Sequence, residues 1–110
     1  MQNRYRTHYI GELTPDMENQ QVVLAGWVHE VRNMGKIVFL LIRDRTGIAQ
    51  VTAKDGTVPE QVIKAMDLPK ESVISVKGLV KRNQQSRKGF EIVPSDVENL
   101  NPLSANIPFA

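Results

Sequence analysis

Five segments of this chain have the residues of β-strands, and one short helix interrupts them, between the third segment and the fourth. The strand-like segments cover residues 21–31, 37–44, 48–53, 71–80 and 89–94, the last continuing weakly to 100. Turn residues separate the first three, with Asn33-Met34-Gly35 before the second and Thr46-Gly47 before the third. Strands dominate without βαβ alternation, which argues against a parallel sheet.

This order of elements predicts an all-β fold. A five-stranded Greek-key barrel with a helix between strands three and four is the layout of the OB-fold. The helix is expected over residues 57–68, with Thr57 as its N-cap and Pro59 in its first turn. A short N-terminal helical turn is expected after Thr14, where a proline follows. A small SH3-like barrel is the competing fold, but it does not naturally take a helix of this length at that place.

The length of 110 residues suits one domain with a single core. The tail from Asn101 has two prolines, no period and an apolar end, which is typical of a linker. Gly26, in the middle of the first strand, indicates a bend or bulge that lets the strand curl. We therefore expect one domain over residues 1–102 and the start of a linker over 103–110.

Composition excludes several classes of protein. The chain has no cysteine, so it has neither disulfides nor cysteine-ligated metals, and His8 and His29 lie too far apart to suggest a zinc site. No apolar run approaches the roughly 20 residues that span a membrane, and no secretory signal is visible, so the cytoplasm is expected. No nucleophile motif or phosphate-binding glycine loop is present, so the chain is interpreted as a binder. Its net charge of +2 permits an anionic partner.

The segment Ile37–Arg43 raises the question of what one aromatic side chain is for. Alternation places Val38, Leu40 and Ile42 on one face and Phe39, Leu41 and Arg43 on the other. The first set suits the barrel interior, because an arginine cannot be buried unpaired there. Phe39 then points outward, where a nucleic-acid base can stack on it. The alternative is that its ring packs under the N-terminal arm, residues 1–12, or under the helix expected over 57–68.

Three polar residues are candidates for contacts beside that ring. Gln50 lies on the strand that pairs with the second, close to Phe39, and its amide has the donor and acceptor needed to read a base edge. Arg32 could meet a phosphate or a base, or be a solvated strand end. Glu91 could accept hydrogen bonds from a base amino group, or form a salt bridge to Lys88 or Arg82.

Basic residues gather in the loop before the fifth strand. The sequence KRNQQSRK places four cations within eight residues: Lys81, Arg82, Arg87 and Lys88. Beside a stacking surface they are expected to contact phosphates, and otherwise they are solubilising charge. A second basic set, Arg43 and Arg45, flanks Asp44.

Segments along nearly the whole chain are familiar when taken together: YRTHYIGEL, VVLAGWVHEVRNMGKIVFLLIRDRTGIAQVT, SVISVKGLV and GFEIVPSDVENLN. They resemble the N-terminal, anticodon-binding OB-fold domain of class IIb aminoacyl-tRNA synthetases, most closely the archaeal-type aspartyl branch. Asparaginyl and lysyl members share the skeleton from Gly26 to Gln50. The opening Tyr5-Arg6-Thr7-His8-Tyr9 and the Arg43-Asp44-Arg45 form favour the aspartyl branch.

The resemblance implies roles for five residues. The stacking aromatic of the family falls on Phe39, which would hold the central U of the anticodon, and its glutamine falls on Gln50. Its strand-one arginine falls on Arg32 and its strand-five acid on Glu91. His29 lies where members that also charge asparagine tRNA tend to have histidine, so relaxed selectivity is expected; the alternative is a strand residue with no reading role.

The resemblance also implies a larger enzyme. Members attach aspartate to tRNA with ATP and magnesium in a C-terminal catalytic domain, and no motif of that domain occurs here. This part is therefore expected to hold no catalytic residue, cofactor or metal. Members are homodimers mainly through the catalytic domain, so a fragment is expected to be largely monomeric. A stand-alone OB module that binds single-stranded nucleic acid without sequence preference, and a protein-interaction barrel, are the alternatives.

Overall fold

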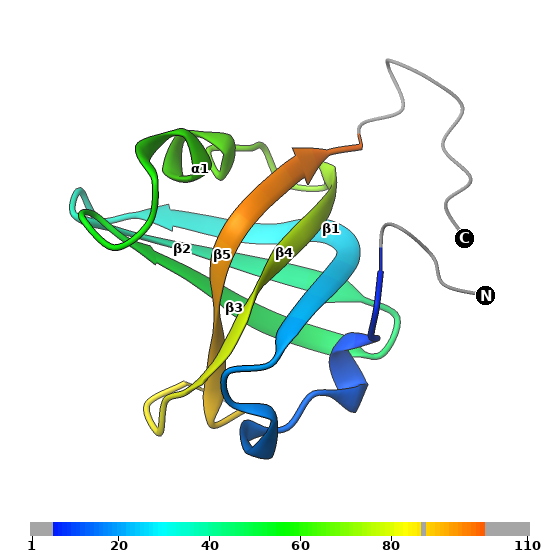
Figure 1. Cartoon of the computed structure of the whole chain (residues 1–110). Helices are drawn as coiled ribbons and strands as arrows, with labels where there is room; N and C mark the ends of the chain where they lie inside the picture. The colour runs from blue at the N-terminus through cyan, green and yellow to red at the C-terminus, as the bar shows by residue number, and fades with distance from the viewer. Residues whose placement is uncertain (1–5, 87, 101–110) are drawn as a thin grey trace.

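Five strands close into a barrel in the order β1-β2-β3-β5-β4 (Figure 1). The computed structural model describes residues 6–86 and 88–100. The strands are β1 (Gln21–Asn33), β2 (Ile37–Asp44), β3 (Gly47–Lys54), β4 (Val73–Arg82) and β5 (Phe90–Asn99). All pairings are antiparallel except the one that closes the barrel, where Val51 of β3 meets Ile92 of β5 in parallel. The predicted all-β OB-fold barrel is confirmed. The expected linker 103–110 lies outside the described residues.

Strand β1 is long because it serves two partners. Its first half pairs with β4 and its second half with β2, and Trp27 pairs with both. Gly26 lies at this change of partner, and a Cβ on it would come 2.2 Å from the carbonyl oxygen of Arg43. No side chain fits in that space, so glycine is required for β2 to approach. The register shifts between Val28 and Glu30, so the bulge in this strand is at His29.

The barrel interior is filled by the aliphatic face that alternation predicted on β2. Val38, Leu40 and Ile42 are all 3% exposed or less. Burying a side chain of this size contributes about 1.5–3 kcal/mol relative to leaving it in water. The inward face of β1 contributes Val22, Leu24 and Val28, which are fully buried. The outward face of β2, with Phe39, is thereby left available to a ligand.

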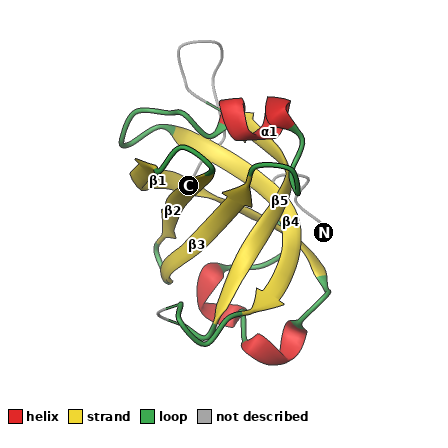
Figure 2. Ribbon diagram, turned by 90° about the vertical axis from the view of Figure 1, so that its left-hand side faces the viewer, coloured by secondary structure: helices red, strands yellow, loops and turns green. Residues whose placement is uncertain are grey.

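Short helices close the two ends of the barrel (Figure 2). Helix α1 (Glu60–Ala65) lies across one end and buries Val62. It is shorter than expected, because the Thr57 hydroxyl donates to the carbonyl of Lys54 (2.8 Å) and closes the preceding turn. The expectation that Thr57 caps the helix is therefore wrong; Pro59 holds the N-cap position. Among the described residues, no helix has the length and apolarity needed to cross a bilayer.

Two 3-10 turns, η1 (Ile10–Glu12) and η2 (Pro15–Met17), lie at the other end, and η2 follows Thr14 as predicted. Asp44, only 4% exposed, ties η1 to the barrel. Its carboxylate accepts hydrogen bonds from the amides of Ile10 (2.9 Å), Thr46 (2.7 Å) and Gly47 (3.2 Å). Burial alone would raise the pKa of Asp44, but these hydrogen bonds outweigh it and hold the pKa below its ordinary value.

Candidate nucleic-acid interface

The outward sides of β1, β2 and β3 form one surface, which we call the three-strand face. The register aligns its side chains in three rows of neighbours: Arg32, Phe39 and Thr52; Glu30, Leu41 and Gln50; Trp27, Arg43 and Ile48. The bulge at His29 is what brings Glu30 and Arg32 onto this face, because the inserted residue reverses the alternation that begins at Trp27. The face therefore combines one phenyl ring, one amide and several charges.

Two hollows lie on this face, and Phe39 and Gln50 line both of them. The first, of about 290 Å³, is lined by Glu30, Arg32, Phe39, Leu41 and Gln50. The second, of about 320 Å³, is lined by Ile37, Phe39, Gln50, Thr52, Lys54, Asn83, Gln85, Ser86 and Glu91. Phe39 is half-buried and points outward, as predicted, and no described residue of the N-terminal arm or of α1 lines either hollow. A partly exposed ring between two hollows is suited to stacking.

Gln50 is held in place by two hydrogen bonds from its Nε2. One goes to Oγ1 of Thr52 (2.9 Å) and one, longer, to Oε1 of Glu91 (3.5 Å). Thr52 is nearly buried, so it fixes the amide from below. With Nε2 oriented in this way, the carbonyl oxygen of Gln50 has a defined direction as an acceptor.

Glu91 meets Gln50 because β5 lies beside β3, where Val51 pairs with Ile92. Of the salt bridges considered from the sequence, the one to Arg82 is not seen. Arg82 instead pairs with Asp16 and Glu18. Glu91 therefore belongs to the polar edge of the second hollow.

Arg32 lines the first hollow, and its side chain is 71% exposed. Its Nε donates a hydrogen bond to the carboxylate of Glu30, which lines the same hollow. This hydrogen bond, together with the charge of Arg32, lowers the pKa of Glu30. His29 is exposed on the bulge and is not among the described residues that line either hollow.

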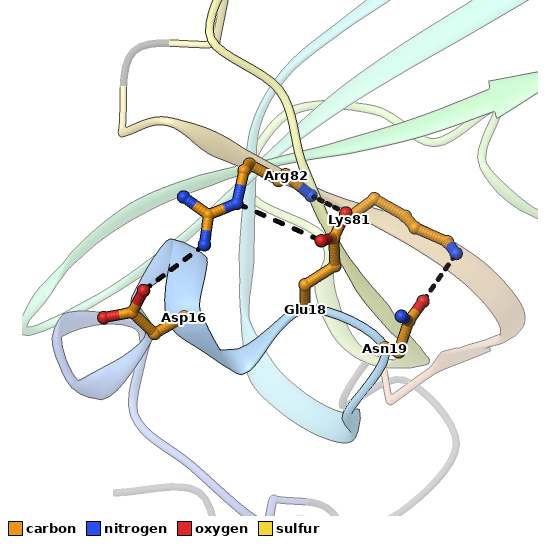
Figure 3. A network of polar contacts seen from close by, with 5 residues as sticks. All are labelled: Asp16, Glu18, Asn19, Lys81 and Arg82. Atoms are coloured by element: carbon orange, nitrogen blue, oxygen red, sulfur yellow. Dashed lines mark hydrogen bonds and ion pairs between the residues drawn. The ribbon is translucent and has the colours of Figure 1, made fainter.

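The four basic residues expected in the loop before β5 do not all lie there, because Lys81 and Arg82 are the last two residues of β4. Lys81 donates to Oδ1 of Asn19 (2.8 Å), and Arg82 contacts Asp16 (3.3 Å) beside η2 (Figure 3). Neither is among the described residues that line the hollows. Lys88 is exposed, and its Nζ lies against Gly47 at the start of β3. A Cβ added to that glycine would come 2.8 Å from this nitrogen.

Arg87 lies outside the described residues, and a contact of this loop with phosphate stays a prediction. What the loop does supply to the second hollow are short polar side chains, those of Asn83, Gln85 and Ser86. Within residues 6–86 and 88–100, no group of three or more His, Cys, Asp or Glu side chains is arranged to hold a metal ion.

Comparison with known proteins agrees with this geometry. The family described as OB-fold nucleic acid binding domain, whose model carries the name tRNA anti-codon, matches residues 22–100. The aspartate–tRNA(Asp/Asn) ligase of Archaeoglobus fulgidus is 46% identical over 101 residues, which are 91% of this chain and 24% of that protein. The chain thus spans about a quarter of the length of the curated relatives that it matches.

Solved structures give the same result for the fold. Asparaginyl-tRNA synthetase from Pyrococcus horikoshii superposes with a TM-score of 0.77 at 35% identity, covering 93% of this chain and 24% of that one. A smaller protein, OBody AM2EP06 bound to hen egg-white lysozyme, superposes with a TM-score of 0.83 at 30% identity, covering 92% of this chain and 98% of that one. The fold therefore occurs both within synthetases and by itself.

Proposed function

This chain belongs to the OB-fold nucleic acid binding domain family, and we propose that it binds the anticodon of a tRNA as one domain of an aspartate–tRNA ligase. The observation that carries the proposal is the position of Phe39 and Gln50. A ring and a fixed amide adjoin each other between two hollows on the strands where OB-folds take oligonucleotides. The names of the relatives support the choice of tRNA as the nucleic acid.

In this proposal the three anticodon bases are unstacked from one another and spread over the three-strand face. The central base lies on the ring of Phe39, and its neighbours occupy the hollows on either side. Such stacking contributes about 1–3 kcal/mol per base but does not distinguish bases. Distinction comes from polar groups at the rims, namely Gln50 and Glu91 at one hollow and Arg32 at the other.

The rest of the activity belongs to the part of the ligase beyond this domain. There aspartate would be activated with ATP and magnesium, and there most of the dimer contact would form. The 110-residue chain would then be largely monomeric, act in the cytoplasm, and need no cofactor to bind RNA. Sedimentation of the chain without RNA tests the monomer, and a stable dimer would contradict it.

Replacing Gln50 by alanine is expected to reduce discrimination between anticodons more than affinity. The variant keeps the ring of Phe39 but loses the amide that reads a base edge, a contact worth about 1–3 kcal/mol of discrimination. The measurement is titration of the chain with the cognate anticodon stem-loop and with stem-loops carrying single base changes. Gln61→Ala is the matched control, because Gln61 is an exposed glutamine on α1 that lines neither hollow.

Unchanged discrimination in Gln50→Ala would favour a binder without sequence preference. A loss of all binding in both variants would instead indicate misfolding, which a thermal melt detects. Neither outcome alters the role proposed for stacking, which is tested separately through Phe39.

We further propose that selectivity between aspartate and asparagine tRNAs is relaxed in this domain. The relatives named as Asp/Asn ligases support this, and His29 is the residue that the family resemblance connects with it. Stem-loops that differ only in the third anticodon base, C or U, are expected to bind within about threefold of each other, or about 0.7 kcal/mol. A preference of tenfold or more for C, about 1.4 kcal/mol, would contradict relaxed selectivity.

A further inference from the structure

The five arginines of the described residues fall into two groups. Arg32 and Arg82 form ion pairs with carboxylates. The other three lie over aromatic rings, and no ion pair with a described residue is seen for them: Arg6, Arg43 and Arg45. Unpaired guanidinium groups held in defined positions are available to an anion from outside the domain.

Two of these guanidinium groups share one ring. The Cζ of Arg6 lies 4.3 Å from the centroid of Tyr9, and the Cζ of Arg45 lies 4.8 Å from the same point. A ring attracts each cation, but the two like charges repel each other. A bound anion removes that repulsion. The third group, that of Arg43, lies 5.9 Å from the ring of Trp27.

Two carboxylates that adjoin these residues accept hydrogen bonds from other groups. Asp44 lies between the two arginines in sequence. Its carboxylate accepts hydrogen bonds from the amides of η1 and of the β2–β3 turn and from the Thr46 hydroxyl. Glu12 accepts a hydrogen bond from the amide of Tyr9 (2.6 Å). Neither carboxylate forms an ion pair with Arg43 or Arg45, so these keep their donors for a ligand.

This arginine–aromatic patch, defined as Arg43, Arg45, Tyr9 and Trp27, continues the three-strand face. Arg43 and Trp27 belong to the third row of the three-strand face, next to the row of Leu41 and Gln50. Arg43 lies four positions after Phe39 along β2, which is about 13 Å at the rise of a strand. A nucleic-acid strand whose bases lie on Phe39 reaches the patch with its neighbouring phosphates.

We propose that Arg43 and Arg45, held against Trp27 and Tyr9, bind phosphates of the RNA strand beside the anticodon whose central base lies on Phe39. This inference rests on the proposed function and adds a second contact region to it. The planar guanidinium fork matches phosphate geometry, and the ring behind it fixes its plane. Arg6 is excluded from the ligand set, since its Nη2 already donates to the carbonyl of Ala25 (3.5 Å).

The test is the salt dependence of RNA binding by the 110-residue chain. Arg43→Gln with Arg45→Gln is compared with a control pair, Lys64→Gln with Lys77→Gln. The control removes the same charge from exposed residues on α1 and β4, and β4 is not adjacent to β2 or β3. The probes are an anticodon stem-loop and the anticodon trinucleotide alone.

For the stem-loop, the slope of log K against log salt concentration is expected to become shallower by about 0.7–0.9 per lost phosphate contact, or about 1.4–1.8 in the arginine pair. The control pair should keep the parent slope. The trinucleotide keeps the two phosphates between its bases but lacks those on either side of the anticodon, so it should bind the arginine variant almost as well as the parent. Arg43→Lys with Arg45→Lys should recover most of the slope, since the charge is retained.

Equal slopes for the arginine pair and the control pair would overturn the proposal. If Phe39→Ala still weakens binding in that case, the proposed anticodon function stands without the patch. If instead the arginine pair keeps its RNA affinity but loses binding to poly-glutamate, the patch takes an acidic polypeptide and the phosphate assignment is wrong.

Discussion

Replacing Phe39 by alanine is expected to weaken anticodon stem-loop binding by about 1–3 kcal/mol, roughly 5- to 150-fold in the dissociation constant. The ring is half-buried on the outward face of β2 and lines both hollows, so its loss removes the surface on which the central base lies. Fluorescence titration with a labelled stem-loop at one fixed salt concentration measures the change. The salt must be fixed because phosphate contacts vary with it.

Two further variants at this position separate stacking from mere apolar contact. Phe39→Trp keeps a π-face and is expected to retain most of the affinity, whereas Phe39→Leu keeps apolar bulk but loses the face and should behave like alanine. If Phe39→Ala binds within twofold of the parent while its thermal melt is unchanged, the base does not lie on this ring.

Replacing Asp44 by alanine is expected to lower the free energy of unfolding by about 2–4 kcal/mol. The amides of Ile10, Thr46 and Gly47 would each lose an acceptor, and the first of them lies in a buried environment. A buried donor left without a partner costs about 1–3 kcal/mol. Urea unfolding followed by far-UV circular dichroism gives the value. Asp55→Ala, at an exposed position after β3, is the control and should change it little.

The same carboxylate predicts how stability depends on pH. Its pKa in the folded chain lies below the ordinary value of about 3.8. The stabilisation is therefore fully present above that value and is lost as the pH falls through the lower, folded pKa. Asp44→Asn should make stability less dependent on pH below about 4, compared with the parent. An equally steep loss in Asp44→Asn and the parent would show that Asp44 is not the responsible group.

Periodicity was sufficient to predict which side chains of β2 are buried and that Phe39 is not among them. Val38, Leu40 and Ile42 are buried while Phe39 points outward, because alternation on a strand follows directly from the backbone. The two-residue turn lies at Arg45-Thr46, one residue earlier than expected, and the register that it sets pairs Asp44 with Gly47 and puts Gln50 opposite Leu41. Both features depend on residues that are close in sequence.

Features that depend on distant residues could not be predicted. Glu30 was missed because the bulge at His29 reverses the alternation, and no residue type in that strand marks it. The ion pair between Arg82 and Asp16 joins residues 66 positions apart, and no local pattern predicts it. The polar residues of the β4–β5 loop that line the second hollow were not predicted either. An irregular loop has no period from which the direction of its side chains can be derived.

The most direct test of stacking is an NMR spectrum of the 110-residue chain bound to an anticodon stem-loop, with the Phe39 ring isotopically labelled. The ring protons are expected to show NOEs to the H5 and H6 protons of the central anticodon base. That contact would identify the surface and the base together. A saturated complex in which the Phe39 ring shows no NOE to any anticodon base, while its shifts stay those of the free chain, would contradict the account.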